Sequence, residues 1–179
     1  MNLPNKLTVL RMILVPLFMV FMMFNNLWCT MTGLAIFIIA SITDWLDGYL
    51  ARRDNLVTTF GKFMDPLADK MLTTAALLII MEKGYISSWV LLIVLGREFL
   101  VAGVRLAAVG EGKVIAASMW GKAKTVAQMI AIIVSIILIS IPNFDAYLIV
   151  NILIWISTVL TLISGADYLI KNKDFIKTN

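Results

Sequence analysis

Residues 31–51 read MTGLAIFIIASITDWLDGYLA, an apolar run that ends in a segment with two aspartates. A helix of about 20 apolar residues is long enough to cross the hydrocarbon core of a bilayer. Acidic side chains are rare in such helices because each costs at least about 2.5 kcal/mol near the centre of the membrane. The stretch therefore predicts a membrane-spanning helix that carries Asp44 and Asp47 near one end for a functional reason.

Five further apolar stretches lie on either side of this one. Hydrophobic residues make up 61% of the 179 residues and charged residues 15%, with a mean hydropathy of +0.95. Soluble domains have roughly 45–50% apolar and about 25% charged residues. The composition predicts an all-α integral membrane protein, with residues 1–179 forming a single domain. The six expected spans are 7–24, 31–51, 65–82, 88–108, 118–140 and 145–169.

The distribution of positive charge predicts the orientation of these spans. Of the 15 lysines and arginines, 13 fall on the side of the N-terminus, Lys83 falls on the other side, and Arg97 lies within a span. Because cytoplasmic segments carry the excess of Lys and Arg, we expect both termini in the cytoplasm. The basic residues are dispersed among apolar runs, so the net charge of +4 indicates an anionic membrane surface and no nucleic-acid partner.

The chain contains no histidine and one cysteine, Cys29. This composition excludes a zinc site of His and Cys, a Ser-His-Asp triad and a His-ligated haem. It also excludes an internal disulfide. Any chemistry must therefore come from carboxylates, hydroxyls, Lys, Arg and the backbone.

Four aspartates lie within 26 positions at the facing ends of the second and third expected spans. Asp44 and Asp47 are three residues apart, and Asp65 and Asp69 are four apart, so each pair lies on one helix face. The short loop between the helices brings both pairs to one depth near the cytoplasmic surface. Four neighbouring carboxylates need counter-charge, and oxygen ligands without His or Cys suit Mg²⁺ or Mn²⁺. Two such ions are the usual device for displacement at phosphorus.

Residues beside the aspartates fit a phosphate ligand. Gly48 and Gly61 allow a ligand to approach the backbone, and Arg52 offers a forked donor for phosphate oxygens. Pro66 fits the first turn of a helix, with Asp65 near its cap. Two alternatives are ion pairs with neighbouring Lys and Arg at the helix ends, and a path for protons or cations. A permeation path predicts acids near mid-membrane on several helices, whereas these acids cluster at one face.

Residues 44–69 match, without a gap, the pattern D-x2-D-G-x2-A-R-x8-G-x3-D-x3-D. With this pattern and its six expected spans, the chain resembles the CDP-alcohol phosphotransferase family. The resemblance implies an enzyme that moves a substituted phosphate from a CDP-linked donor to an alcohol and releases CMP. It implies two divalent cations, Mg²⁺ or Mn²⁺, bound by Asp44, Asp47, Asp65 and Asp69, with Asp69 also acting as the catalytic general base. It implies a CDP-donor site formed by Gly48, Ala51, Arg52, Gly61, Asn5 and Thr8.

Segments outside this pattern, at 4–11, 96–98 and 121–128, resemble bacterial members of the family. Those members use CDP-diacylglycerol as donor and sn-glycerol 3-phosphate as acceptor, in the cell membrane with the active site at the cytoplasmic face. The cations expected to bind the acceptor phosphate are Arg97, Arg105, Lys122 and Lys124.

Several alternatives stay open at this point. The lysines of the fifth span also fit a topological role in which they extend to lipid headgroups. Phosphatidylglycerol or an inositol phosphate could replace glycerol 3-phosphate as acceptor, and a small cation transporter or a structural membrane adaptor is possible from a different class. Small residues on the spans permit a homodimer.

Overall fold

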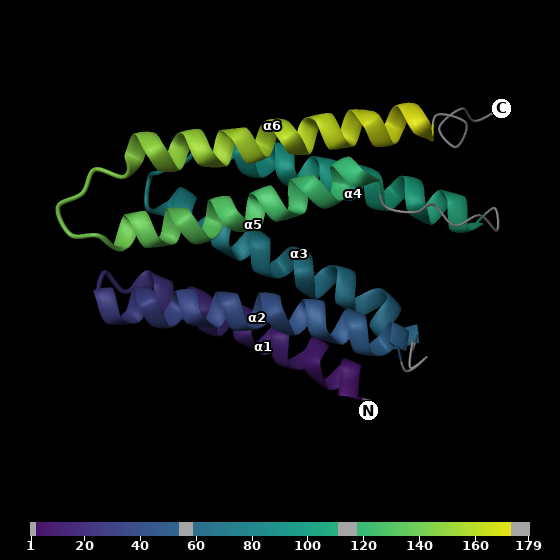
Figure 1. The fold of residues 1–179 in the computed structure, drawn as a ribbon, viewed down its shortest axis with the longest axis horizontal. Helices are drawn as coiled ribbons and strands as arrows, with labels where there is room; N and C mark the ends of the chain where they lie inside the picture. Colours follow the sequence, from purple (N-terminus) through teal and green to yellow (C-terminus); the bar gives the residue numbers. More distant parts are fainter. Residues whose placement is uncertain (1–2, 54–58, 111–117, 173–179) are drawn as a thin grey trace. The chain divides into compact units, whose positions relative to one another are not determined.

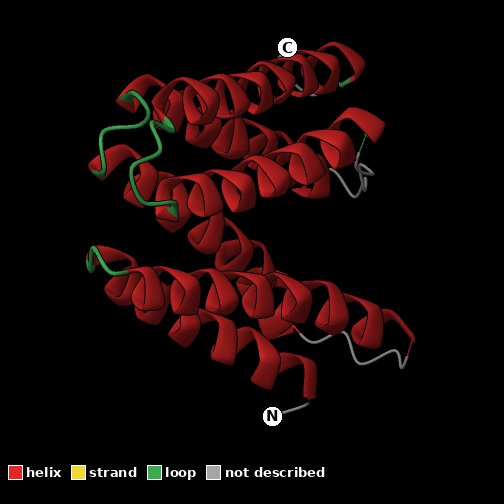
Figure 2. Cartoon of the chain, turned by 60° about the vertical axis from the view of Figure 1, so that its left-hand side comes forward, coloured by secondary structure: helices red, strands yellow, loops and turns green. Residues whose placement is uncertain are grey.

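The computed structural model describes residues 3–53, 59–110 and 118–172, leaving aside the side chains of 3–4, 45, 47–53, 59–63, 65–66 and 109. The secondary structure of these ranges is entirely helical, with short connections (Figure 2). The predicted all-α class is therefore confirmed for the described chain. The helices are α1 Leu3–Met23, α2 Leu27–Arg53, α3 Thr59–Glu82, α4 Ser88–Gly110, α5 Met119–Ser140 and α6 Tyr147–Lys171.

Helix α3 begins earlier than the apolar pattern predicts. It starts at Thr59, six residues before the expected start at residue 65. Pro66 consequently lies inside the helix, and the prediction that it occupies the first turn is wrong. Hydropathy marks only the part of a helix that suits the bilayer, whereas the helix continues into its polar flank.

Four helices are long and apolar enough to cross a membrane: Asn5–Met23, Leu27–Asp44, Met119–Ser140 and Tyr147–Lys171. Helix α3 falls short because Asp65, Asp69 and Lys70 lie within it. Helix α4 likewise contains two arginines and a glutamate. The chain is thus a membrane protein, and the charges that set α3 and α4 apart are among those assigned above to a site.

The first of two compact units comprises residues 1–83 and 136–144. In it α1 packs along α2 and also contacts α3 (Figure 1). The Phe18 and Phe37 rings of α1 and α2 meet with centroids 5.6 Å apart. A Cβ atom on Gly33 would lie 2.9 Å from Sδ of Met22, so this glycine permits the close approach of α1 and α2. Close packing of this kind holds helices together where lipid is as apolar as the protein.

One polar contact shows which helix ends of this unit lie together. Lys83 Nζ donates a hydrogen bond of 2.9 Å to Oδ1 of Asn25. Lys83 follows α3, and Asn25 lies between α1 and α2. The start of α1, the end of α2 and the start of α3 therefore share the opposite end, where the aspartates are.

The second unit comprises residues 84–135 and 145–179, and in it α4 packs on α6. At one end Asn151 Nδ2 donates to the backbone oxygen of Tyr85 at 3.1 Å. Along α6 the buried hydroxyls of Ser157, Thr158 and Thr161 donate to carbonyls of their own helix at 2.8–2.9 Å. These polar groups are thereby satisfied inside an otherwise apolar helix. The buried apolar residues of α4 are Val90, Val94, Val101 and Ala108.

Candidate active site

The N-terminal half of α1 buries a polar face. Asn5 is 9% exposed, and Thr8 and Arg11 are fully buried. Spacings of three residues place them along one side of the helix. A buried guanidinium needs a negative partner, and Nη1 of Arg11 donates to Oδ1 of Asp44 on α2. The Asp44 side chain is 37% exposed, so Arg11 holds this carboxylate from the buried side while its other side stays accessible.

The backbone places all four aspartates at one end of neighbouring helices. Asp44 and Asp47 lie in the C-terminal part of α2, and Asp65 and Asp69 in the first half of α3, with α2 in contact with α3. The Asp69 side chain is half-buried. The side chains of six other predicted site residues lie outside the described residues: Asp47, Gly48, Ala51, Arg52, Gly61 and Asp65. Among the side chains that are described, no three acidic or thiol groups come together, and metal binding stays a prediction.

Arg11 is the residue whose importance the sequence analysis missed. From the sequence it counts only as one of the positive charges on the cytoplasmic side. An arginine within an apolar run is itself unusual, and its spacing from Asn5 and Thr8 marks the same helix face. That pattern could have identified it as the partner of a carboxylate.

A second polar cluster joins three helices in the other unit. Arg97 and Glu98 lie on α4, Lys124 on α5 and Ser164 on α6. Nη1 of Arg97 donates to Oε1 of Glu98 at 3.2 Å, and Nζ of Lys124 donates to the same oxygen. Nη2 of Arg97 donates to Oγ of Ser164 at 2.7 Å. The structure thus brings two of the four predicted acceptor-binding cations together, through a shared glutamate.

The other two predicted cations do not join this cluster. Arg105 lies over the ring of Tyr168, with Cζ 5.6 Å from the centroid and Nε donating to the hydroxyl at 3.4 Å. Lys122 is exposed, and the described chain offers it no ion pair. The exposed position of Lys122 also fits the alternative of a lysine that extends to lipid headgroups.

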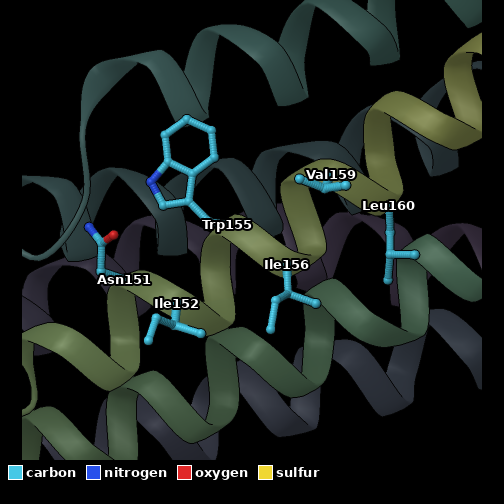
Figure 3. A pocket seen from close by; sticks show the side chains of 6 residues that line it. All are labelled: Asn151, Ile152, Trp155, Ile156, Val159 and Leu160. Carbon is cyan, nitrogen blue, oxygen red and sulfur yellow. The ribbon is translucent and has the colours of Figure 1, made fainter.

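The apolar face of α6 carries a hollow of about 410 Å³. Figure 3 shows its lining side chains along the helix, namely Asn151, Ile152, Trp155, Ile156, Val159 and Leu160. The Asn151 amide already donates to Tyr85, so the lining offers little to a charged group. Phosphate chemistry therefore belongs to the two polar clusters and not to this hollow.

The family model for CDP-alcohol phosphatidyltransferases matches residues 1–163. The chain belongs to this family. The matched range contains the aspartates of α2 and α3, Arg11, and the Arg97–Glu98–Lys124 contacts. The family predicted from residues 44–69 is therefore confirmed.

Curated relatives match almost the whole chain. The chain is 41% identical to the CDP-diacylglycerol–glycerol-3-phosphate 3-phosphatidyltransferase of Bacillus subtilis, over 99% of this chain and 98% of the relative. It is 40% identical to proteins of the same name from Rickettsia felis, over 93% of each chain, and from Salmonella paratyphi A, over 94% and 93%. The prediction of a transferase enzyme is confirmed.

Proposed function

We propose that this protein transfers the phosphatidyl group of CDP-diacylglycerol to sn-glycerol 3-phosphate, giving phosphatidylglycerophosphate and CMP. The observation that carries the proposal is the similarity to the Bacillus subtilis enzyme named for these substrates, through 99% of the chain. The clusters described above supply carboxylates for one part of the reaction and paired cations for another. The apolar exterior suits a donor whose acyl chains stay in the bilayer.

Two divalent cations, Mg²⁺ or Mn²⁺, fit the donor set at the aspartate end of α2 and α3. The proposed ligands are carboxylates only, namely Asp44, Asp47, Asp65 and Asp69, and hard oxygen donors favour these ions. Arg11 supports the fit because it fixes one oxygen of Asp44 and leaves that side chain partly accessible. When bound, such ions hold the diphosphate and neutralise the charge that grows on the departing CMP.

The residues of the first unit have distinct proposed roles. Asp69 accepts the proton of the attacking hydroxyl, since a chain without histidine has a carboxylate as its base near neutral pH. Arg52 donates to the diphosphate, and the glycines allow the nucleotide to approach the backbone. The proposed donor site comprises Gly48, Ala51, Arg52, Gly61, Asn5 and Thr8.

The acceptor phosphate is proposed to bind the cations of α4 and α5. Arg97 and Lys124 are the strongest candidates because both are mostly buried and held by one carboxylate. Their pair of positive charges exceeds the single charge of Glu98, so the cluster favours an anion. Arg105 and Lys122 remain proposed contributors at more exposed positions.

The proposed location is the bacterial cell membrane, with six spans in one domain, both termini in the cytoplasm and the active site at the cytoplasmic face. Four apolar helices support membrane insertion, and the excess of positive charge supports the orientation. The homodimer stays a prediction from the small residues of the spans.

This orientation predicts that Cys29 lies toward the outer face. As the only cysteine of the chain, it is expected to react with a membrane-impermeant maleimide in intact cells. The matched control is Asn172→Cys in a Cys29→Ser background, at the other end of the membrane, which should react only after permeabilisation. If the Asn172→Cys variant reacts in intact cells and the wild type does not, the proposed orientation is reversed.

The reaction is tested by CMP release from the purified protein in detergent with CDP-diacylglycerol and Mg²⁺. Glycerol 3-phosphate, inositol phosphate, serine and phosphatidylglycerol are compared as acceptors, with a chelator as control. We expect release with glycerol 3-phosphate and none after chelation. Release with phosphatidylglycerol or inositol phosphate instead would identify a different acceptor, and no release with any acceptor would favour the cation transporter.

A further inference from the structure

Glu98 is the shared partner of the two mostly buried cations of the second unit. Its Oε1 atom accepts hydrogen bonds from both Arg97 and Lys124. The Arg97 and Lys124 side chains are each 9% exposed and that of Glu98 is 14% exposed. Two like charges at such low exposure repel each other unless an anion lies between them. Glu98 therefore joins α4 to α5 and keeps the two cations together.

Arg97 is fixed on two further sides. Its Nη2 donates to Ser164, and its Cγ lies 3.0 Å from where a Cβ atom on Gly165 would be. Its Nε is buried and has no hydrogen-bond partner among the described residues. Nε and Nη2 form one edge of the guanidinium, so this edge, beside the Ser164 hydroxyl, retains a donor for a further anion.

We infer that Glu98 is a positioning residue that holds Arg97 and Lys124 as a fixed pair for the phosphate of the acceptor. The pair thereby selects phosphomonoester acceptors over neutral alcohols. This inference rests on the proposed function and names a residue to which that function assigned no role. Because Glu98 contacts Nη1 whereas the free donor is Nε, the phosphate binds beside Glu98 and does not replace it.

The opposite role makes an opposite prediction. If the Glu98 carboxylate instead occupied the place of the phosphate, its removal would free both cations and lower the KM for the acceptor. If Glu98 positions the cations, its removal lets Lys124 extend toward the lipid headgroups and raises that KM. The sign of the change in KM therefore decides between the two roles.

The first test is Glu98→Gln, which keeps an oxygen acceptor and removes the charge. We expect the KM for glycerol 3-phosphate to rise about tenfold, the effect of weakening a charge-assisted hydrogen bond. The expected kcat and KM for CDP-diacylglycerol stay within about twofold of wild type, because the lost interaction acts in acceptor binding. Glu98→Asp, which keeps the charge on a shorter side chain, is expected to restore part of the acceptor affinity.

The second test moves Arg97 without changing any charge. Gly165→Ala places a methyl group against Arg97 Cγ and should also raise the KM for glycerol 3-phosphate by about tenfold. Gly103→Ala is the matched control, since a Cβ atom there meets nothing within 4 Å. It is expected to leave the KM for the acceptor as in wild type.

Binding without turnover separates this inference from the proposed function. Glycerol 3-phosphate should raise the melting temperature of the purified wild-type protein and of Gly103→Ala, and raise that of Glu98→Gln and Gly165→Ala less. If the wild type releases CMP but Glu98→Gln has an unchanged or lower acceptor KM, the positioning role is wrong and the proposed function stands. If glycerol 3-phosphate neither reacts nor stabilises the wild type, the proposed function and the inference both fail.

Discussion

Asp69→Asn is expected to reduce the kcat for CMP release by about 10²–10⁴-fold, the usual contribution of a general base. Asparagine keeps the shape of the side chain but cannot accept the proton of the glycerol 3-phosphate hydroxyl. The half-buried position of Asp69 on α3, among other carboxylates, leaves no histidine to take over this role. Turnover is measured at saturating donor, acceptor and Mg²⁺.

Asp167→Asn provides the matched control for this substitution. Asp167 lies on α6 and pairs with Lys171, whose side chain is 63% exposed, so its replacement should leave kcat within about twofold. Both variants should elute as folded protein from size exclusion in detergent. Ordinary turnover by Asp69→Asn would show that another group takes the proton.

Arg11→Met is expected to lower CMP release at limiting Mg²⁺ by about 10–100-fold, as removal of an outer partner of a metal ligand does. Arg11 is fully buried and donates to Asp44, so methionine fills much of its volume but leaves the carboxylate without its holder. Because the defect lies in the placement of a ligand, raising the Mg²⁺ concentration should restore part of the activity.

Lys6→Met is the matched control, because it also removes one positive charge from α1. Lys6 is exposed, and we expect activity within about twofold of wild type at every Mg²⁺ concentration. If Arg11→Met matches wild type at limiting Mg²⁺, Arg11 serves packing alone. If its loss persists at saturating Mg²⁺, its role is not to place a metal ligand.

The helices were predictable because apolar composition over about 20 residues needs no tertiary information. The helix bounds were not, since α3 extends to Thr59 through residues that lower its hydropathy. The segment from Asp44 to Asp69 predicted the family for a related reason. Its glycines and aspartates stand at fixed spacings along the chain, so the pattern is visible without the fold.

Contacts between helices far apart in the chain were not predictable. Arg11 and Asp44 are 33 positions apart, and Lys124 and Glu98 are 26 apart. Spacing places residues on a helix face but does not say which helix that face meets. Charge alone also grouped Arg105 with the acceptor site, whereas the fold pairs Arg105 with Tyr168.

The central claim is that the aspartates of α2 and α3 bind the divalent cations on which transfer depends. The most direct test is titration of the purified protein with Mn²⁺ in the presence of CDP-diacylglycerol, following free Mn²⁺ by electron paramagnetic resonance. The account predicts two bound ions per chain, weaker binding in Asp44→Asn and in Asp69→Asn, and wild-type binding in Asp167→Asn. Wild-type Mn²⁺ binding by a variant with all four aspartates replaced by asparagine would contradict it.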